Sequence, residues 1–116
     1  MDIVCLNYGG GGEVVDAVRR LIEDGVRASD VDEDAITSRL YVPDLPEPDL
    51  IIRTAGERRV SNFLLWQSAY SEMLVSETLW PDFDIPDLKA AIADYGSRVR
   101  NFGGRPEDGQ AQNVAR

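Results

Sequence analysis

The feature that most constrains this chain is a short apolar run that leads directly into a basic loop. Residues 50–52 are consecutive aliphatic residues, which is typical of a buried strand in a parallel sheet. The loop that follows places three arginines and a serine within nine residues, at Arg53, Arg58, Arg59 and Ser61. Ligands of α/β sheets bind at the carboxyl ends of strands, and the planar guanidinium group matches phosphate oxygens. The loop is therefore predicted to bind a diphosphate.

The N-terminal residues are predicted to begin a βαβ unit. Residues 3–6 are continuously apolar and favour a buried strand, with Cys5 as a small core residue. The glycines at 9–12 can either form a tight turn or cradle a phosphate through backbone amides. Residues 13–22 predict an amphipathic helix whose inward stripe is Val14, Ala17, Val18, Leu21 and Ile22.

Four more elements are predicted further along the chain. Residues 30–40 favour a short acidic helix, and residues 63–70 favour a buried helix with Ser61 as its N-cap. Residues 73–75 favour a strand. A last helix begins at Asp84, Pro86 and Asp87, with an inward stripe of Leu88, Ala91, Ile92, Tyr95 and Val99. The expected fold class is α/β, with a partly parallel sheet flanked by helices.

The composition is that of one acidic domain. The chain has 116 residues, a formal net charge of −9, eleven arginines, one lysine and no histidine. An acidic surface argues against nucleic acid as a partner, and an anionic ligand then needs a local basic cluster or a divalent cation. Acidic residues in excess, with almost no lysine, favour a salt-adapted protein. We expect a domain over residues 1–102 and a flexible polar tail over 103–116.

The redox compartment and location follow from two further observations. Cys5 is the single cysteine, so no internal disulfide can form, and a reducing compartment is expected. No basic-then-apolar leader follows Met1, and no apolar run approaches the roughly 20 residues needed to cross a bilayer. The sequence therefore predicts a soluble, cytoplasmic chain.

A long block of this sequence resembles a known family. Residues 48–57 and 59–67, then Tyr70, Glu72 and residues 79–83, are similar to the signature of the cis-prenyltransferases, the undecaprenyl diphosphate synthase type of isoprenyl transferase. Residues 7–10 resemble another block of that family. Its enzymes are longer, and their N-terminal Asp-Gly-Asn-Gly-Arg loop does not occur here. The resemblance thus implies the C-terminal portion of the cis-prenyltransferase fold.

The resemblance also implies a reaction and a substrate clamp. Family members condense isopentenyl diphosphate with an allylic diphosphate and form a Z-polyprenyl diphosphate lipid carrier. Arg53, Arg59 and Ser61 match the residues that hold the diphosphate of isopentenyl diphosphate. Arg53 and Arg59 are therefore the expected catalytic residues, and Arg58 is expected to be only a solvated neighbour. Contact with a membrane is expected at most at its surface, through the lipid product.

Supporting residues, a cation and a second subunit are implied in the same way. Glu72 matches a glutamate that helps to hold Mg²⁺. Glu57 is expected to orient Arg53 or Arg59 through a salt bridge, and Asn62 is expected to support the clamp. The resemblance further implies a homodimer.

Two departures from the family pattern leave alternatives open. Gly11 stands where the family has an arginine, which favours the tight turn over a phosphate cradle. Asn101 stands where a C-terminal Arg-x-Gly element has its arginine, so Arg100 or Arg105 would have to substitute. Because the N-terminal catalytic aspartate is missing, the chain alone is expected to lack turnover. The alternative is a non-catalytic diphosphate-binding remnant or an accessory subunit.

Overall fold

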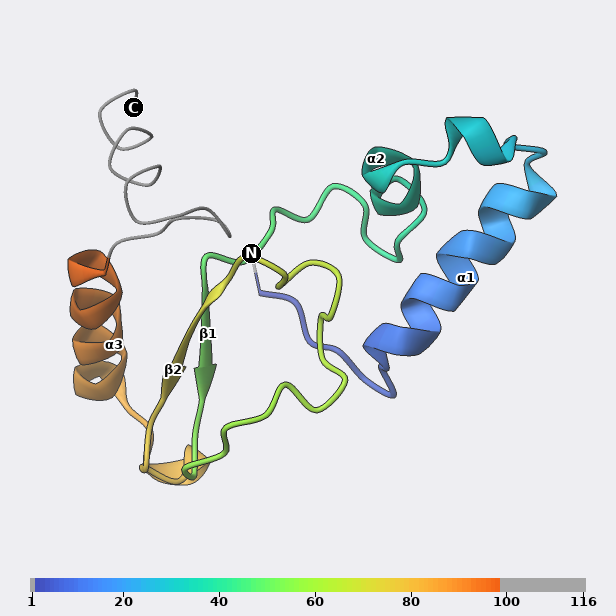
Figure 1. Cartoon of the computed structure of the whole chain (residues 1–116). Helices are drawn as coiled ribbons and strands as arrows, with labels where there is room; N and C mark the ends of the chain where they lie inside the picture. Colours follow the sequence, from blue (N-terminus) through green and yellow to red (C-terminus); the bar gives the residue numbers. More distant parts are fainter. Residues whose placement is uncertain (1, 99–116) are drawn as a thin grey trace. The chain divides into compact units, whose positions relative to one another are not determined.

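The computed structural model describes residues 2–98, which fall into two compact units. The first unit comprises the residues up to 47 together with residues 60–67, and the second comprises residues 48–59 with the residues from 68 onward. Each unit has its own helices, and the second contains the sheet (Figure 1). The α/β class predicted from sequence is confirmed. The predicted tail over 103–116, its boundary at residue 102 and Val99 of the last helical stripe lie outside the described residues.

The first unit is built around helix α1 (Gly10–Glu23). It is followed by a 3₁₀ turn, η1 (Ala28–Asp30), and by the short helix α2 (Glu33–Thr37), whose N-cap Asp32 accepts a hydrogen bond from the Ala35 amide at 2.7 Å. The predicted helix over 13–22 is confirmed. The helix predicted over 30–40 is much shorter, because its carboxyl half turns away after Thr37.

Only part of the predicted inward stripe of α1 is buried. Ala17 and Leu21 are buried, and Leu40 joins them in the core of this unit. Val18 is 40% exposed and Ile22 is 72% exposed, so their predicted burial is wrong. They lie beside the buried stripe, which is narrower than the apolar face of the helix.

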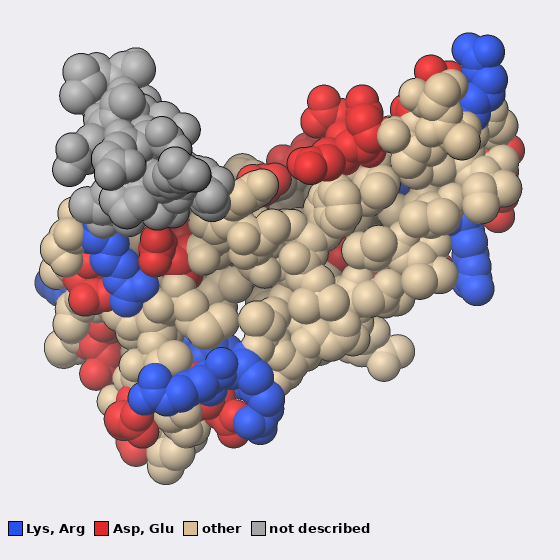
Figure 2. Space-filling model, in the orientation of Figure 1, with Lys and Arg blue, Asp and Glu red and all other residues tan. Residues whose placement is uncertain are grey.

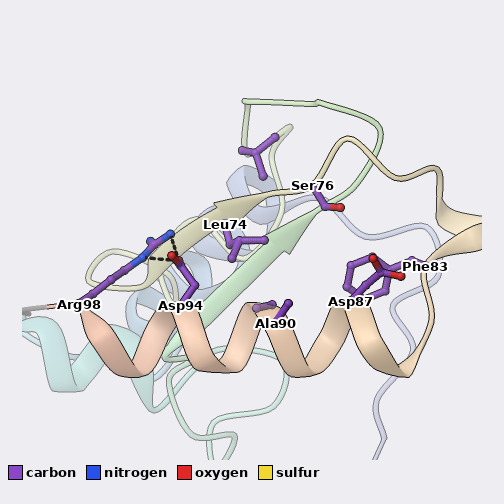
Figure 3. Close-up of a pocket in the computed structure, with 9 residues that line it drawn as sticks. Leu74, Ser76, Phe83, Asp87, Ala90, Asp94 and Arg98 are labelled. Atoms are coloured by element: carbon purple, nitrogen blue, oxygen red, sulfur yellow. Dashed lines mark hydrogen bonds and ion pairs between the residues drawn. The ribbon is translucent and has the colours of Figure 1, made fainter.

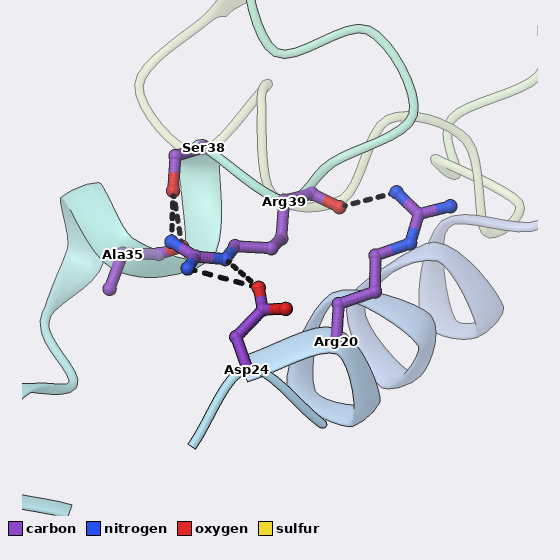
Figure 4. Close-up of polar contacts among 5 residues, drawn as sticks. All are labelled: Arg20, Asp24, Ala35, Ser38 and Arg39. Atoms are coloured by element: carbon purple, nitrogen blue, oxygen red, sulfur yellow. Dashed lines mark hydrogen bonds and ion pairs between the residues drawn. The ribbon is translucent and has the colours of Figure 1, made fainter. Parts of the chain in front are cut away.

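An ion pair links the end of α1 to the segment after α2. Arg39 contacts the Asp24 carboxylate through its Nε and Nη2 atoms at 3.3 and 3.2 Å (Figure 4). Arg20 donates to the Arg39 carbonyl at 3.1 Å. The Arg39 side chain thus fastens the α2 segment onto the last turn of α1.

The glycine run forms the first turn of α1 and not the predicted tight turn. Gly9 is the N-cap, with an extended φ of −139°. A side chain on Gly10 would place its Cβ 3.0 Å from the Asn62 carbonyl oxygen and 3.0 Å from two atoms of Leu65. Glycine is therefore needed at this position for the close approach of another segment, and not for a turn.

Two further predicted elements are wrong. Residues 3–6 form no strand, Val4 and Leu6 are 79% and 84% exposed, and Cys5 is exposed too. A strand needs a neighbour to satisfy its backbone groups, and the described sheet contains only two other segments. Residues 63–70 form consecutive turns, and no helix begins after Ser61.

The turns over 61–64 have a clear backbone cause. Ser61, Asn62 and Leu64 have φ values of 52°, 61° and 45°. A right-handed helix requires negative φ, so these residues cannot start or continue one, and Ser61 is not an N-cap. The Trp66 indole of this segment donates to the Thr37 hydroxyl at 3.0 Å, which fixes it in the first unit.

The second unit contains a parallel pair of strands, β1 (Leu50–Arg53) and β2 (Glu72–Val75). Leu50 pairs with Glu72 and Arg53 pairs with Val75. Both strands were predicted and are confirmed, each extended by one polar residue. All of their residues are half-buried, in keeping with a sheet that has few neighbours.

Helix α3 (Ile85–Ser97) follows the 3₁₀ turn η2 (Trp80–Asp82) and lies beside β2 (Figure 1). The predicted start is confirmed, because Asp84 is the N-cap and its amide donates to the Asp87 carboxylate at 3.0 Å in a capping box. Ala91 is buried, whereas Leu88 and Ile92 of the predicted inward stripe are exposed. None of the described helices is both long and apolar enough to span a bilayer.

Alanine substitutions at two glycines of α1 provide a test of this fold. Gly10→Ala is expected to destabilise the chain by about 1–3 kcal/mol, because the new Cβ would press on Asn62 and Leu65. Gly12→Ala has nothing within 4 Å of its Cβ and is expected to stabilise by up to about 1 kcal/mol through helix propensity. Urea unfolding followed by circular dichroism measures both, and equal effects would contradict the close approach.

Candidate functional site

Arg53 lies at the carboxyl end of β1, where its backbone is fixed by the sheet. Its carbonyl accepts a hydrogen bond from the Ser76 amide at 2.7 Å, just beyond the end of β2. The side chain is half-buried, and its Nε atom is buried without a hydrogen-bond partner among the described residues. A buried donor left unsatisfied costs about 1–3 kcal/mol. The Arg53 guanidinium is therefore suited to an anionic ligand.

The loop after β1 is pinned against the segment after β2. The amides of Ala55 and Gly56 donate to the carbonyls of Thr78 and Ser76, each at 2.9 Å. Ala55 and Gly56 have φ values of 56° and 69°, which turn the chain back sharply. Glycine is favoured at position 56 because a residue with a side chain seldom adopts its φ of 69°. This loop presents the other two arginines.

Each of these arginines faces an acidic neighbour. Arg59 Nη1 lies 2.7 Å from Glu57 Oε2, and Arg58 Nη2 lies 3.9 Å from Glu77 Oε1. Both guanidinium groups are largely exposed, so the two pairs contribute little to stability. Basic atoms gather with acidic ones beside them over the lower end of the β1–β2 sheet (Figure 2). A diphosphate can therefore displace the Glu57 and Glu77 carboxylates from these arginines at a small cost in free energy.

The remaining members of the predicted clamp belong to the other unit. Ser61 and Asn62 are part of the first unit, whereas Arg53 and Arg59 are part of the second. Ser61 is exposed, and its hydroxyl is free to meet a ligand oxygen. The convergence of Ser61 with the two arginines stays a prediction.

Glu72 lies at the other end of the sheet from Arg53. In the parallel register Glu72 pairs with Leu50 and Arg53 pairs with Val75, so the two are three positions apart, or about 10 Å along the strands. Glu72 Oε2 accepts from Arg98 Nη1 at 3.2 Å, and the same Nη1 donates to the Met73 carbonyl at 2.8 Å. The side chain of Glu72 is thus held at the amino end of β2.

Arg98 also binds Asp94 on α3. Its Nη2 and Nε atoms lie 2.6 and 2.8 Å from Asp94 Oδ2 (Figure 3). The hydrogen bond that Arg98 donates to Asp94 raises the pKa of Arg98 above its ordinary value, and the Glu72 carboxylate adds to this. The two carboxylates join α3 to β2 beside a pocket of about 390 Å³, lined by Leu74, Ser76, Ala91 and their neighbours.

These residues do not by themselves fit a magnesium site next to Arg53. Protein-bound Mg²⁺ takes one or two carboxylates together with substrate phosphates and water. Glu72 offers one carboxylate, but it lies at the opposite end of the sheet and is bound by Arg98. The described part of the chain contains no group of three or more side chains able to hold a metal ion.

Comparison with known proteins places the chain in a family. The family model described as "Putative undecaprenyl diphosphate synthase" matches residues 2–103. The chain belongs to this family. Over 101 residues it is 50% identical to the "Isoprenyl transferase" of Fusobacterium nucleatum, and over 104 residues it is 50% identical to that of Thermotoga maritima.

Solved structures of the isoprenyl transferases share the fold. Lavandulyl diphosphate synthase from Lavandula x intermedia, in complex with dimethylallyl diphosphate, matches 84% of this chain and 44% of its own, with 40% identity and a TM-score of 0.79. A probable undecaprenyl diphosphate synthase from Campylobacter jejuni covers 84% of this chain and 45% of its own, with 36% identity and a TM-score of 0.74.

The chain spans less than half the length of the isoprenyl transferases it matches. It covers 43% of the Fusobacterium nucleatum protein and 45% of the Thermotoga maritima protein. The match to the family, predicted from residues 48–83, is confirmed. The roles of Arg53, Arg59, Ser61 and Glu72 stay predictions.

Sequence reasoning missed a buried carboxylate in this isoprenyl transferase segment. Glu13 is 2% exposed and accepts hydrogen bonds from Tyr8 Oη, from Gln67 Nε2 at 3.0 Å and from the Tyr41 amide at 3.0 Å. The sequence held one sign that Glu13 is buried, because Glu13 and Ala17 are four residues apart and lie on the same face of the helix. Glu13 thereby fastens three separate segments to α1.

Glu13 also helps to raise the pKa of the neighbouring Tyr8. Burial raises the pKa of Tyr8, and the hydrogen bond to Glu13 raises it further. Because the folded-state pKa exceeds the unfolded value near 10, this contribution to stability is complete below about pH 10 and is lost as pH rises through the folded pKa. Tyr8→Phe is therefore expected to reduce the alkaline loss of stability.

A titration measures this coupling directly. Glu13→Gln is expected to lower the pKa of Tyr8 toward its ordinary value, because the negative charge beside the phenol is removed. The ultraviolet absorbance of tyrosinate, compared between Glu13→Gln and Tyr8→Phe chains, isolates the Tyr8 step. Glu23→Gln, at the exposed end of α1, is the matched control. An unchanged titration in Glu13→Gln would contradict the contact.

Proposed function

We propose that this chain is the isopentenyl diphosphate-binding portion of an isoprenyl transferase. The observation that supports it most is the Arg53 guanidinium, which lies at the carboxyl end of β1 with a buried Nε donor that no described group satisfies. A diphosphate oxygen would satisfy that donor and neutralise the charge. The reaction would form a carbon–carbon bond between isopentenyl diphosphate and the allylic carbon, break the allylic carbon–oxygen bond with release of diphosphate, and leave a Z double bond after loss of a proton.

The chain's own groups would bind and orient the substrate. Arg53 and Arg59 would neutralise the diphosphate, and the Ser61 hydroxyl would complete its hydrogen bonds. Glu57 would hold the Arg59 side chain near its working position until the diphosphate replaces it. Holding the diphosphate fixes the direction of the reacting double bond, and such orientation is a large part of catalysis.

Magnesium remains part of the proposal as a group that would supply positive charge to a diphosphate when bound. Glu72 is the carboxylate proposed for it, but the described residues do not bring Glu72 to the Arg53 end of the sheet. The homodimer and the cytoplasmic location also remain proposals.

A non-catalytic diphosphate-binding protein or accessory subunit is the second candidate. What supports it is that the clamp arginines lie within residues 53–59, whereas the Asp-Gly-Asn-Gly-Arg loop of the family does not occur in residues 1–116. Both candidates use the same arginines, and they differ only in turnover.

Binding can be measured by titrating isopentenyl diphosphate into the 116-residue chain in a calorimeter. Arg53→Ala is expected to weaken the affinity about 10- to 100-fold, because one charge-assisted contact is lost. Arg27→Ala removes the same charge from an exposed arginine of the first unit and is the matched control. Equal affinity in the Arg53 and Arg27 variants would contradict the clamp.

Turnover separates the two candidates. The chain alone is expected to elongate no allylic primer in the presence of Mg²⁺ and labelled isopentenyl diphosphate, because it lacks the N-terminal loop with the catalytic aspartate. Extraction and chromatography of labelled polyprenyl products provide the measurement. Elongation by the chain alone would overturn this expectation and remove the non-catalytic candidate.

A further inference from the structure

We propose that Asn62 is a positioning residue, which caps the amino end of α1 and so holds the Ser61 hydroxyl in place for diphosphate binding. The inference rests on the proposed function, because it acts through Ser61. Asn62 itself would not touch the substrate.

Helix α1 begins without a capping side chain of its own. The first N–H groups of any helix lack partners within it, and the N-cap of α1 is Gly9, which has no side chain to offer. Asn62 supplies the missing acceptors from 51 residues further along the chain. Its carbonyl oxygen accepts from the Gly10 amide at 2.6 Å, and its Oδ1 accepts from the Gly11 amide at 2.8 Å.

The glycines at 9–11 leave the space that Asn62 needs to approach the helix end. A Cβ on Gly9 would lie 3.0 Å from Asn62 Nδ2, and a Cβ on Gly11 would lie 3.3 Å from Asn62 Oδ1. Gly12 has nothing within 4 Å. The tight approach is therefore confined to the glycines that Asn62 contacts. Because Asn62 occupies the amides of Gly10 and Gly11, these two donors are not open to a phosphate.

The backbone beside Asn62 needs an anchor. Ser61 and Asn62 both have positive φ, which non-glycine residues seldom adopt, and asparagine tolerates it better than most. Two consecutive residues of this kind do not persist without contacts that hold them. The two hydrogen bonds of Asn62 to α1 are such contacts, and they fix the residue next to Ser61.

A second anchor holds the far end of the same segment. Gln67 Nε2 donates to the buried carboxylate of Glu13, and the Phe63 ring packs edge-on against Tyr8 at 5.7 Å between centroids. Ser61 lies at the other end of this segment and is exposed. The Ser61 hydroxyl therefore depends on the Asn62 anchor more than on Gln67.

The test removes the Asn62 side chain and keeps its backbone freedom. Asn62→Gly tolerates positive φ and loses only the amide group, so it avoids the strain that alanine would add. It is expected to raise the hydrogen-exchange rate of the Gly11 amide at least tenfold and to weaken isopentenyl diphosphate binding about threefold to tenfold, as the loss of one hydrogen bond predicts. Exchange is read by NMR and affinity by calorimetry.

Two further variants show that the effect belongs to the cap. Asn62→Asp keeps an oxygen acceptor and adds negative charge at a helix amino end, so the exchange rate of the Gly11 amide is expected to stay near that of the unsubstituted chain. Asn7→Gly alters an exposed asparagine that also has positive φ, at 51°, and is the matched control. Fast exchange of the Gly11 amide in Asn62→Asp, or binding weakened to the same degree in Asn7→Gly, overturns the inference.

A double-mutant cycle with Ser61→Ala tests the route of action. If Asn62 acts through the Ser61 hydroxyl, Asn62→Gly lowers the affinity in the unsubstituted chain but not in the Ser61→Ala chain. Additive losses would mean a merely structural role and overturn the inference. Unchanged affinity in Asn62→Gly would overturn it while the proposed function stands. If the unsubstituted chain binds no isopentenyl diphosphate, the proposed function fails, and the role given to Ser61 fails with it.

Discussion

The parallel pairing of β1 with β2 is the constraint on which the candidate site depends. The pairing sets Arg53 at the carboxyl end of β1, where its carbonyl is bound by the Ser76 amide. The segment after β2 then provides the carbonyls that hold the amides of Ala55 and Gly56. A loop held in this way can present arginines in a fixed direction. The same pairing places Glu72 at the opposite end of the sheet. The register therefore separates the Glu72 carboxylate from the loop that carries the arginines.

Charge balance decides how strongly the basic loop can hold an anion. The chain carries a net charge of −9, and two of its carboxylates, on Glu57 and Glu77, lie next to Arg59 and Arg58. Exposed ion pairs of this kind are weak. These ion pairs leave the guanidinium groups of Arg58 and Arg59 exposed to solvent, where a ligand can reach them. Arg53 differs, because its Nε atom is buried and no described acceptor reaches it, and it therefore has the most to gain from a diphosphate.

Elements encoded by short-range patterns were predictable, and those that need a distant partner were not. The helix over 13–22, the strands around residues 51 and 74 and the start of α3 at Asp84 follow from periodicity and capping within a few residues. The apolar run 3–6 has the same local pattern as a strand but is not part of the described sheet, which pairs only β1 with β2. The helix predicted over 63–70 is excluded by positive φ at Ser61 and its neighbours, which apolar spacing does not reveal.

The sequence by itself determined the family, and it placed Arg53 and Arg59 within seven residues of each other in one contiguous block. Only the tertiary structure decided the contacts between residues far apart in the chain. Glu13 meets Gln67, Gly11 meets Asn62, and Glu72 meets Arg98 across separations of 54, 51 and 26 residues. Such pairs depend on how segments pack, since a hydrogen bond is set by distance in space. The spacing of residue types along the chain does not reveal that distance.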